Sequence, residues 1–380
     1  MARPHPLLLL ILASAISSDG LGPARATAGQ TGPTIGLLLP PEEPEAASLG
    51  QGVQLAVEHA NQGAVGKVSL VIRGRVGQWG ADAVEAARMV LDDGAQGLIA
   101  PPSGAATHLA LQVSGRTAVP VCSLCPDSSV TRAGIPWMLR VAPGTIEEAR
   151  TVFSGLGLPA SNRWVAFVPD GRAGREVLKD LAQAAIAVSS KLEKTWETTS
   201  PLTNIETLVA QVVTNRPEGI LLWLDPVPAG TLARRLRKAG YQGKLAGPSR
   251  CQSPAFAAAA AGSLEGFLIA GMVLDPQSAG RLVSFRKAFR ERFGREGDLT
   301  SAQSYDAATL LIELFRRAPA ANLPKAFPLA FSLPGVTGEL SFDSYGNRKV
   351  ALQLLAGHEG HFDPVKAGGQ NPQTLKQLEQ

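Results

Sequence analysis

The chain has 380 residues, of which 45% are hydrophobic and 18% are charged, with 40 glycines and 28 prolines. This composition excludes a disordered or fibrous chain and indicates a compact, turn-rich protein with substantial apolar cores. The length favours two domains, and the formal net charge of +4 is too small to indicate a nucleic-acid-binding protein.

The N-terminus has the pattern of a secretory signal peptide. Arg3 precedes an apolar run at residues 7–16, and residues 26–28 read Ala-Thr-Ala, a small-x-small cleavage pattern. The apolar run is too short to span a bilayer. We therefore expect residues 1–28 to be removed on export to the periplasm. No cysteine precedes Cys122, so we expect no lipid anchor.

Short apolar runs alternate with segments of helical period along most of the chain. The runs, typical of buried strands, lie at residues 34–39, 68–72, 97–100, 119–122, 164–168 and 219–224. Helices are expected between them, at residues 48–61, 81–93, from about 104, 175–188, 205–214 and 230–239. This alternation predicts an α/β fold of two lobes, each a doubly wound parallel sheet with helices on both faces. Near the C-terminus, residues 338–342 and 350–355 instead predict an antiparallel hairpin.

The sequence carries no motif that indicates catalysis. It has no phosphate-binding loop, no G-x-S-x-G nucleophile turn and no H-E-x-x-H zinc-protease helix. The segment His-Glu-Gly-His at residues 358–361 places its histidines only three apart and lies near a turn. We predict a protein that is not an enzyme and has no cofactor.

A binding site is better supported by the segment Pro-Ser-Gly-Ala at residues 102–105. It follows a predicted strand and opens a predicted helix, so its backbone N–H groups are available to a ligand beyond the carboxyl end of the sheet. Ser103 either only caps this helix or also contacts a ligand, and the two interpretations are compatible.

Cys122 and Cys125 form a C-x-x-C at the end of a predicted strand, and Cys251 is the remaining cysteine. The thiols could simply be buried in the core. Three other interpretations are a disulfide, a redox-active pair, and a soft-metal site shared with Cys251 and His108. Burial is favoured, and we predict no metal.

The order of these pieces resembles the type 1 periplasmic solute-binding proteins of the leucine/isoleucine/valine-binding kind. The matching segments are IGLLLP, GLIAPPSGAAT, VPVCS with LRVAP downstream, SYDAATLLIEL and GVTGELSFDSYGN. The resemblance implies two lobes joined by crossing segments near residues 141–144, 271–275 and 333–338. Lobe 1 would comprise residues 33–143 and 272–333, lobe 2 residues 144–271 and 334–365, and a C-terminal tail residues 366–380.

The resemblance also implies where a ligand binds. The residues carried over position by position are Ser103, Gly104, Ser123, Cys125, Asp127, Thr145, Ala173, Asp225 and Ser249. Gly104 stands where the family has a carboxylate-binding serine, and Ser249 where it has an amine-binding glutamate. Asp127 also lies close to the expected carboxylate pocket, although it could equally cap the next helix. These departures work against a branched-chain amino acid as ligand.

Together these observations predict an exported, monomeric solute-binding protein. It would capture a small polar ligand, an amino acid, amide or short carboxylate, and deliver it to the membrane subunits of an ABC importer. The alternatives are a sensing or interaction module with a degenerate pocket, and a soft-metal-binding variant. A thiol oxidoreductase would require Cys122 or Cys125 to turn over a disulfide.

Overall fold

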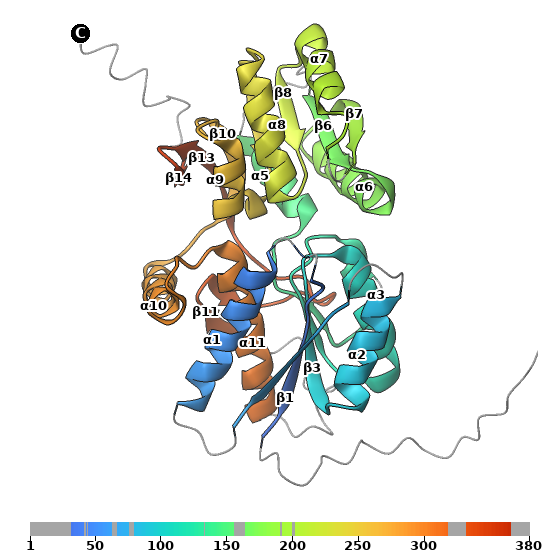
Figure 1. Cartoon of the computed structure of the whole chain (residues 1–380), viewed down its shortest axis with the longest axis vertical. Helices are drawn as coiled ribbons and strands as arrows, with labels where there is room; N and C mark the ends of the chain where they lie inside the picture. Colours follow the sequence, from blue (N-terminus) through green and yellow to red (C-terminus); the bar gives the residue numbers. More distant parts are fainter. Residues whose placement is uncertain are drawn as a thin grey trace, which may run out of the picture.

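A computed structural model describes residues 32–41, 43, 45–62, 67–75, 80–132, 134–155, 164–190, 192–199, 202–317 and 332–365. The chain forms two lobes, each built on its own sheet, and Figure 1 shows them stacked along the long axis of the molecule. The predicted signal peptide, 1–28, and tail, 366–380, lie outside the described residues. In the described part of the chain, no helix combines the length and apolarity needed to cross a membrane.

The sheet of the first lobe is parallel throughout, with the strand order β2-β1-β3-β4-β5. Its strands are β1 (Thr34–Leu38), β2 (Ser69–Arg73), β3 (Ala95–Ala100), β4 (Val121–Ser123) and β5 (Met138–Arg140). Every residue of β1, an interior strand of this sheet, is buried. A strand covered on both faces needs apolar side chains at consecutive positions, which explains the continuous apolar run in the sequence.

Two helix pairs cover the faces of this sheet. On one face, α1 (Ala46–Asn61) and α11 (Leu299–Arg317) pack with Ile35 and Leu37 of β1. On the other face, α2 (Ala81–Leu91) and α3 (Gly104–Thr117) pack with Leu38. Successive side chains of a strand point to opposite faces of the sheet, so Leu37 and Leu38 pack against different helix pairs. The short helix α4 (Ser129–Arg132) follows β4, and α10 (Pro276–Phe293) packs outside α1.

The sheet of the second lobe is mixed, with the order β14-β13-β10-β9-β8-β6-β7. Its strands are β6 (Trp164–Pro169), β7 (Leu192–Thr198), β8 (Gly219–Leu222), β9 (Lys244–Gly247), β10 (Phe267–Met272), β13 (Leu352–His358) and β14 (His361–Pro364). Strands β6 to β10 run parallel, β13 pairs antiparallel with β10, and β14 pairs antiparallel with β13. The predicted doubly wound α/β fold of two lobes is therefore confirmed.

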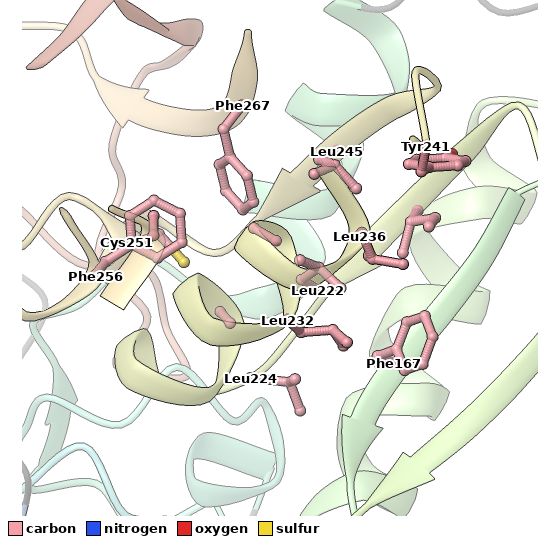
Figure 2. Packing of buried hydrophobic residues seen from close by; sticks show 14 of the residues in the cluster. Phe167, Leu222, Leu224, Leu232, Leu236, Tyr241, Leu245, Cys251, Phe256 and Phe267 are labelled. Atoms are coloured by element: carbon pink, nitrogen blue, oxygen red, sulfur yellow. The ribbon is translucent and has the colours of Figure 1, made fainter. Parts of the chain in front are cut away.

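The helices of the second lobe also lie on both faces of its sheet. They are α5 (Thr145–Gly155) and α6 (Gly171–Ala187) on one face, and α7 (Ile205–Asn215), α8 (Pro226–Lys238) and α9 (Pro254–Ala260) on the other. Figure 2 shows the core on the second face, where Leu232 and Leu236 of α8 lie beside Leu222 of β8.

The predicted C-terminal hairpin is wrong. Strand β12 (Gly338–Leu340) pairs with β11 (Leu333–Gly335), and Leu340 packs in the core of the first lobe. The chain turns at residues 343–347 and makes one antiparallel bridge, Phe342 to Arg348. Strand β13 then joins the second sheet instead. Lobe 1 thus continues past residue 333, where the sequence analysis ended it.

The lobes are connected by three segments of the described chain, at residues 141–144, 273–275 and 341–351. The third lies later than the predicted 333–338. Arg348, which is buried, donates to the carbonyl oxygens of Val141 (3.3 Å), Thr337 (2.9 Å) and Glu339 (3.1 Å). These bonds hold two of the crossing segments to the β11–β12 hairpin.

Candidate functional site

A cavity of about 300 Å³ lies between the two lobes. It lies where the carboxyl ends of parallel strands from both sheets face each other, as ligand sites of open α/β sheets do. Loops after β3 and β4 form the first wall, and loops after β6, β8 and β9 form the second. Glu43, in the connection from β1 to α1, and Thr145, at the start of α5, complete it. The volume is at the lower end of the range for small-molecule sites.

Most of the residues proposed for ligand binding line this cavity. They are Ser103, Gly104, Cys125, Asp127, Thr145, Ala173 and Asp225. Ser103 also caps α3, because its hydroxyl accepts the Ala106 N–H at 3.3 Å. The two interpretations of Ser103 are thus compatible in the structure, while its contact with a ligand stays a prediction.

Ser123 and Ser249 do not line the cavity, so their placement in its walls is corrected. The buried Ser123 hydroxyl lies 2.9 Å from that of Thr107 and accepts the Cys125 N–H at 3.0 Å. The Ser249 hydroxyl donates to the buried carboxyl of Glu148, in its own lobe. Both side chains satisfy polar groups of the protein itself, as buried polar groups require.

Asp127 plays the capping role that the sequence left open. Its Oδ1 accepts the Ser129 N–H at 2.8 Å, at the start of α4. Its Oδ2 faces the N-terminus of α3: a Cβ placed on Gly104 would lie 2.7 Å from it. A carboxylate of the protein therefore lies beside the helix end whose partial positive charge would favour an anion.

Arg250, which sequence analysis did not single out, is the central charged residue of the cleft. It lies in the 3₁₀ turn η1 (Ser249–Cys251) of the second lobe and lines the cavity. Its Nε and Nη2 donate to Oε2 of Glu45 in the first lobe at 2.9 and 2.5 Å, and its Nη1 donates to Asp225 at 2.9 Å. Burial alone would lower the pKa of Arg250, but attraction to Glu45, Asp225 and Glu43 outweighs it and raises the pKa. Arg250 thus ties the lobes together as a cation.

A second bond between the lobes joins Ser128, before α4, to Asp180 of α6. The Ser128 hydroxyl donates to Asp180 Oδ1 at 2.5 Å, and its N–H donates to Oδ2 at 3.2 Å. Burial raises the pKa of Asp180, and these two bonds oppose that rise. At the rim, Arg132 of the first lobe pairs with Glu176 of the second at 3.1 Å. The lobes are therefore in direct polar contact across the cleft.

The three cysteines are free thiols and are buried in three different apolar clusters. Figure 2 shows Cys251 beside Phe256, inside the second lobe. Burial raises the pKa of Cys125 to about 12 and also raises that of Cys122, so neither supplies the thiolate that redox chemistry needs. His108 is hydrogen-bonded to Ser129 at 2.8 Å. No group of metal-binding side chains occurs in the described chain, so the disulfide, redox and soft-metal interpretations are not supported.

The sequence model of a periplasmic binding protein family matches residues 33–337. This chain belongs to that family. The fold described above is the type 1 periplasmic binding fold. No curated protein sequence matches the chain.

Solved structures of periplasmic binding proteins share the whole fold. LivJ, the substrate-binding protein of a branched-chain amino acid transporter from Streptococcus pneumoniae, is 16% identical, with a TM-score of 0.77 over 88% of this chain and 100% of that one. The leucine-binding protein LivK from Thermotoga maritima is 17% identical, with a TM-score of 0.77 over 90% of this chain and 99% of that one. A solute-binding protein from R. palustris in complex with benzoate is 17% identical, with a TM-score of 0.78 over 88% of this chain and 95% of that one. At these identities the likeness establishes the fold alone.

In this periplasmic binding protein, the residues that sequence reasoning missed are mainly charged. They include Glu43, Arg172, Glu176, Asp180 and Arg250. One signal could have identified Glu43: the acidic cluster Glu-Glu-Pro-Glu at residues 42–45 follows directly after a buried strand, at the edge of the sheet where ligands bind.

Proposed function

We propose that this protein captures a small polar solute between its lobes and delivers it to the membrane subunits of an ABC importer. The observation that carries this proposal is the cavity itself, which both lobes line at the carboxyl ends of their strands. Membership of the periplasmic binding protein family and the substrate-binding proteins among its structural neighbours support it. We further propose that the chain is exported through residues 1–28, acts as a monomer in the periplasm and catalyses no reaction.

Ligand binding would work through hinge closure. Three crossing segments connect the lobes, and a ligand that contacts both walls favours the closed arrangement only as far as it binds that arrangement better. The inter-lobe bonds of Arg250 and Asp180 would form in the same step. An importer could then distinguish loaded from empty protein by the relative position of the lobes.

Thermal unfolding with a panel of solutes tests the proposal. The panel covers amino acids, amides, short carboxylates and amines. A ligand at a hundred times its Kd stabilises the folded protein by about 2.7 kcal/mol, which gives a clear rise in melting temperature. No rise with any member of the panel would contradict a solute-binding role.

Two glycines of α3 provide a matched pair of variants for this experiment. Gly104 lines the cavity, and a Cβ there would lie 2.7 Å from Asp127 Oδ2, whereas a Cβ on Gly115 meets nothing within 4 Å. Gly104→Leu should abolish the ligand-induced rise, and Gly115→Leu should preserve it. A sensing role would use the same cavity, so delivery is tested separately, by ligand-dependent ATP hydrolysis of the importer in vesicles.

A further inference from the structure

One carboxyl oxygen in the cleft lacks a hydrogen-bond partner among the described residues. Glu43 lines the cavity, and its side chain is only 8% exposed. Its Oε1 has no hydrogen-bond partner within the described part of the protein. Nη2 of Arg250 forms an ion pair with this oxygen at 3.7 Å, which is beyond hydrogen-bond distance. Because a buried charged acceptor without a hydrogen-bond partner is costly, this oxygen is suited to accept a hydrogen bond from a ligand.

The charges around the cavity favour a cationic donor. Five carboxyl groups line it, from Glu43, Asp127, Glu176, Asp180 and Asp225, against two guanidinium groups, from Arg172 and Arg250. Arg250 already donates to Glu45 and Asp225, so its charge is compensated. Arg172 is exposed, and solvent screens exposed charges. Among the lining carboxyls, Asp225 pairs with Arg250, and Glu176 pairs with Arg132 and Lys179. The carboxyls of Glu43, Asp127 and Asp180 remain, against Arg172, and this smaller excess of negative groups favours a cation.

The N-terminus of α3 offers little to a ligand carboxylate. Asp127 Oδ2 faces Gly104 at this helix end, so a second carboxylate placed there would be repelled at close range. The first wall of the cleft thus favours a ligand without a carboxylate, and Glu43 favours one with a charged nitrogen.

We propose that Glu43 Oε1 binds a cationic nitrogen of the ligand, so that the cleft takes a small organic cation, an alkylammonium or guanidinium compound, in preference to a carboxylate or an α-amino acid. This assignment rests on the proposed solute-binding function and names the class of solute. The bond would be charge-assisted and shielded from water, which makes it stronger than a neutral hydrogen bond. Arg250, Asp225 and Glu45 face Glu43. Arg250 directs its hydrogen bonds to Glu45 and Asp225, so Glu43 Oε1 keeps only a longer ion pair with Arg250 and can accept a hydrogen bond from the ligand.

Calorimetry with defined probes tests the assignment. The cationic probes are ethanolamine, putrescine, agmatine and phenylethylamine, and the comparison probes are benzoate, acetate and isoleucine. We expect at least one cationic probe to bind, with a Kd at least about tenfold higher in Glu43→Gln. Glu206→Gln is the control, because Glu206 of α7 lies outside the cavity lining and its side chain is 74% exposed. It should change the Kd by less than about twofold.

The dependence on pH gives a second readout that a structural defect would not produce. Burial raises the pKa of Glu43 to about 7, and Arg250 opposes that rise. Protons compete with a cation for this carboxylate, so the cationic probe should bind about tenfold more weakly at pH 6 than at pH 8. Glu43→Gln should remove most of this difference. A carboxylate that accepted a hydrogen bond from protonated Glu43 would show the opposite trend.

The outcomes separate this assignment from the proposed function. If only benzoate, acetate or isoleucine binds, or if a cationic probe binds equally well to Glu43→Gln, the assignment is overturned while solute binding stands. If no probe of either kind binds and the broader thermal panel is also silent, both are overturned. Circular dichroism of each variant verifies that it is folded.

Discussion

Replacing Arg250 by glutamine should open the cleft. Arg250 connects the second lobe to Glu45 of the first through two hydrogen bonds, at 2.9 and 2.5 Å. The Glu45 side chain is 4% exposed, and Glu45 also accepts the Thr300 hydroxyl at 2.6 Å within its own lobe. In Arg250→Gln, Glu45 and Glu43 would remain in the cleft without a cation from the protein.

The size of the effect follows from this burial. Removing one member of a buried ion pair costs about 3–5 kcal/mol, because the other charge is left uncompensated. The bond of Arg250 to Asp225 adds little, since the Asp225 side chain is 52% exposed. Separation of the lobes returns Glu45 to water and avoids the cost. The loss should therefore appear in the open–closed equilibrium, and a shift of ~3 kcal/mol changes that ratio by about a hundredfold.

Pulsed electron paramagnetic resonance between the lobes measures this equilibrium. Leu91 on α2 and Ile186 on α6 are 57% and 77% exposed, so cysteines placed there accept spin labels. The native cysteines are at most 1% exposed and stay unlabelled. Arg250→Gln should move the distance distribution to longer values, while Arg235→Gln, which removes an exposed pair with Glu206, should not. An unchanged distribution in Arg250→Gln would refute the reasoning.

Two further predictions concern buried groups. Burial raises the pKa of Glu148 from 4.5 to about 7, against the bonds from Ser249, so its contribution to stability is complete below about pH 4.5 and is lost as the pH rises through 7. The free energy of urea unfolding should fall between pH 5 and 8, and Glu148→Gln should reduce this fall by roughly 2–3 kcal/mol. The exposed control Glu147→Gln should leave the fall unchanged. An unchanged fall in Glu148→Gln would contradict this prediction. The three cysteines should react with a thiol reagent at pH 8 only after unfolding in guanidinium chloride, without prior reduction. A fast native thiol, or a pair that needs a reductant, would restore the redox interpretation.

The sequence predicted the lobes well because buried parallel strands leave a strong local signal. Residues 34–39 and 164–168 are continuous apolar runs, and both form interior strands covered on two faces. The segment at residues 102–105 was placed correctly for the same reason, since a strand followed by a helix fixes where the connecting loop lies. The last strands were harder to predict. The apolar run within residues 350–355 identifies a strand, but the choice between β12 and β10 as its neighbour depends on contacts distant in sequence.

The charged part of the site could not be read in the same way. Arg250 and Glu45 are 205 residues apart, and nothing local in either segment indicates their pairing. Ser249 and Arg250 are adjacent, yet the first turns into its own lobe toward Glu148 and the second toward the other lobe. Which of two neighbouring side chains faces a cleft depends on the turn that carries them, and a three-residue 3₁₀ helix leaves little periodicity to reveal it.

The charges between the lobes have a consequence for how closure is controlled. An apolar contact would favour the closed form by itself, because burying it releases water. Buried ionic groups favour closure only when every one of them has a partner, since an unpaired charge costs more than a pair gains. Arg250 and Asp180 find hydrogen-bond partners in the protein, and Glu43 Oε1 finds none among the residues that the structure describes. A cleft built in this way resists closing until a molecule with the right hydrogen-bond donor arrives, so the same oxygen that selects the ligand would also make closure depend on it.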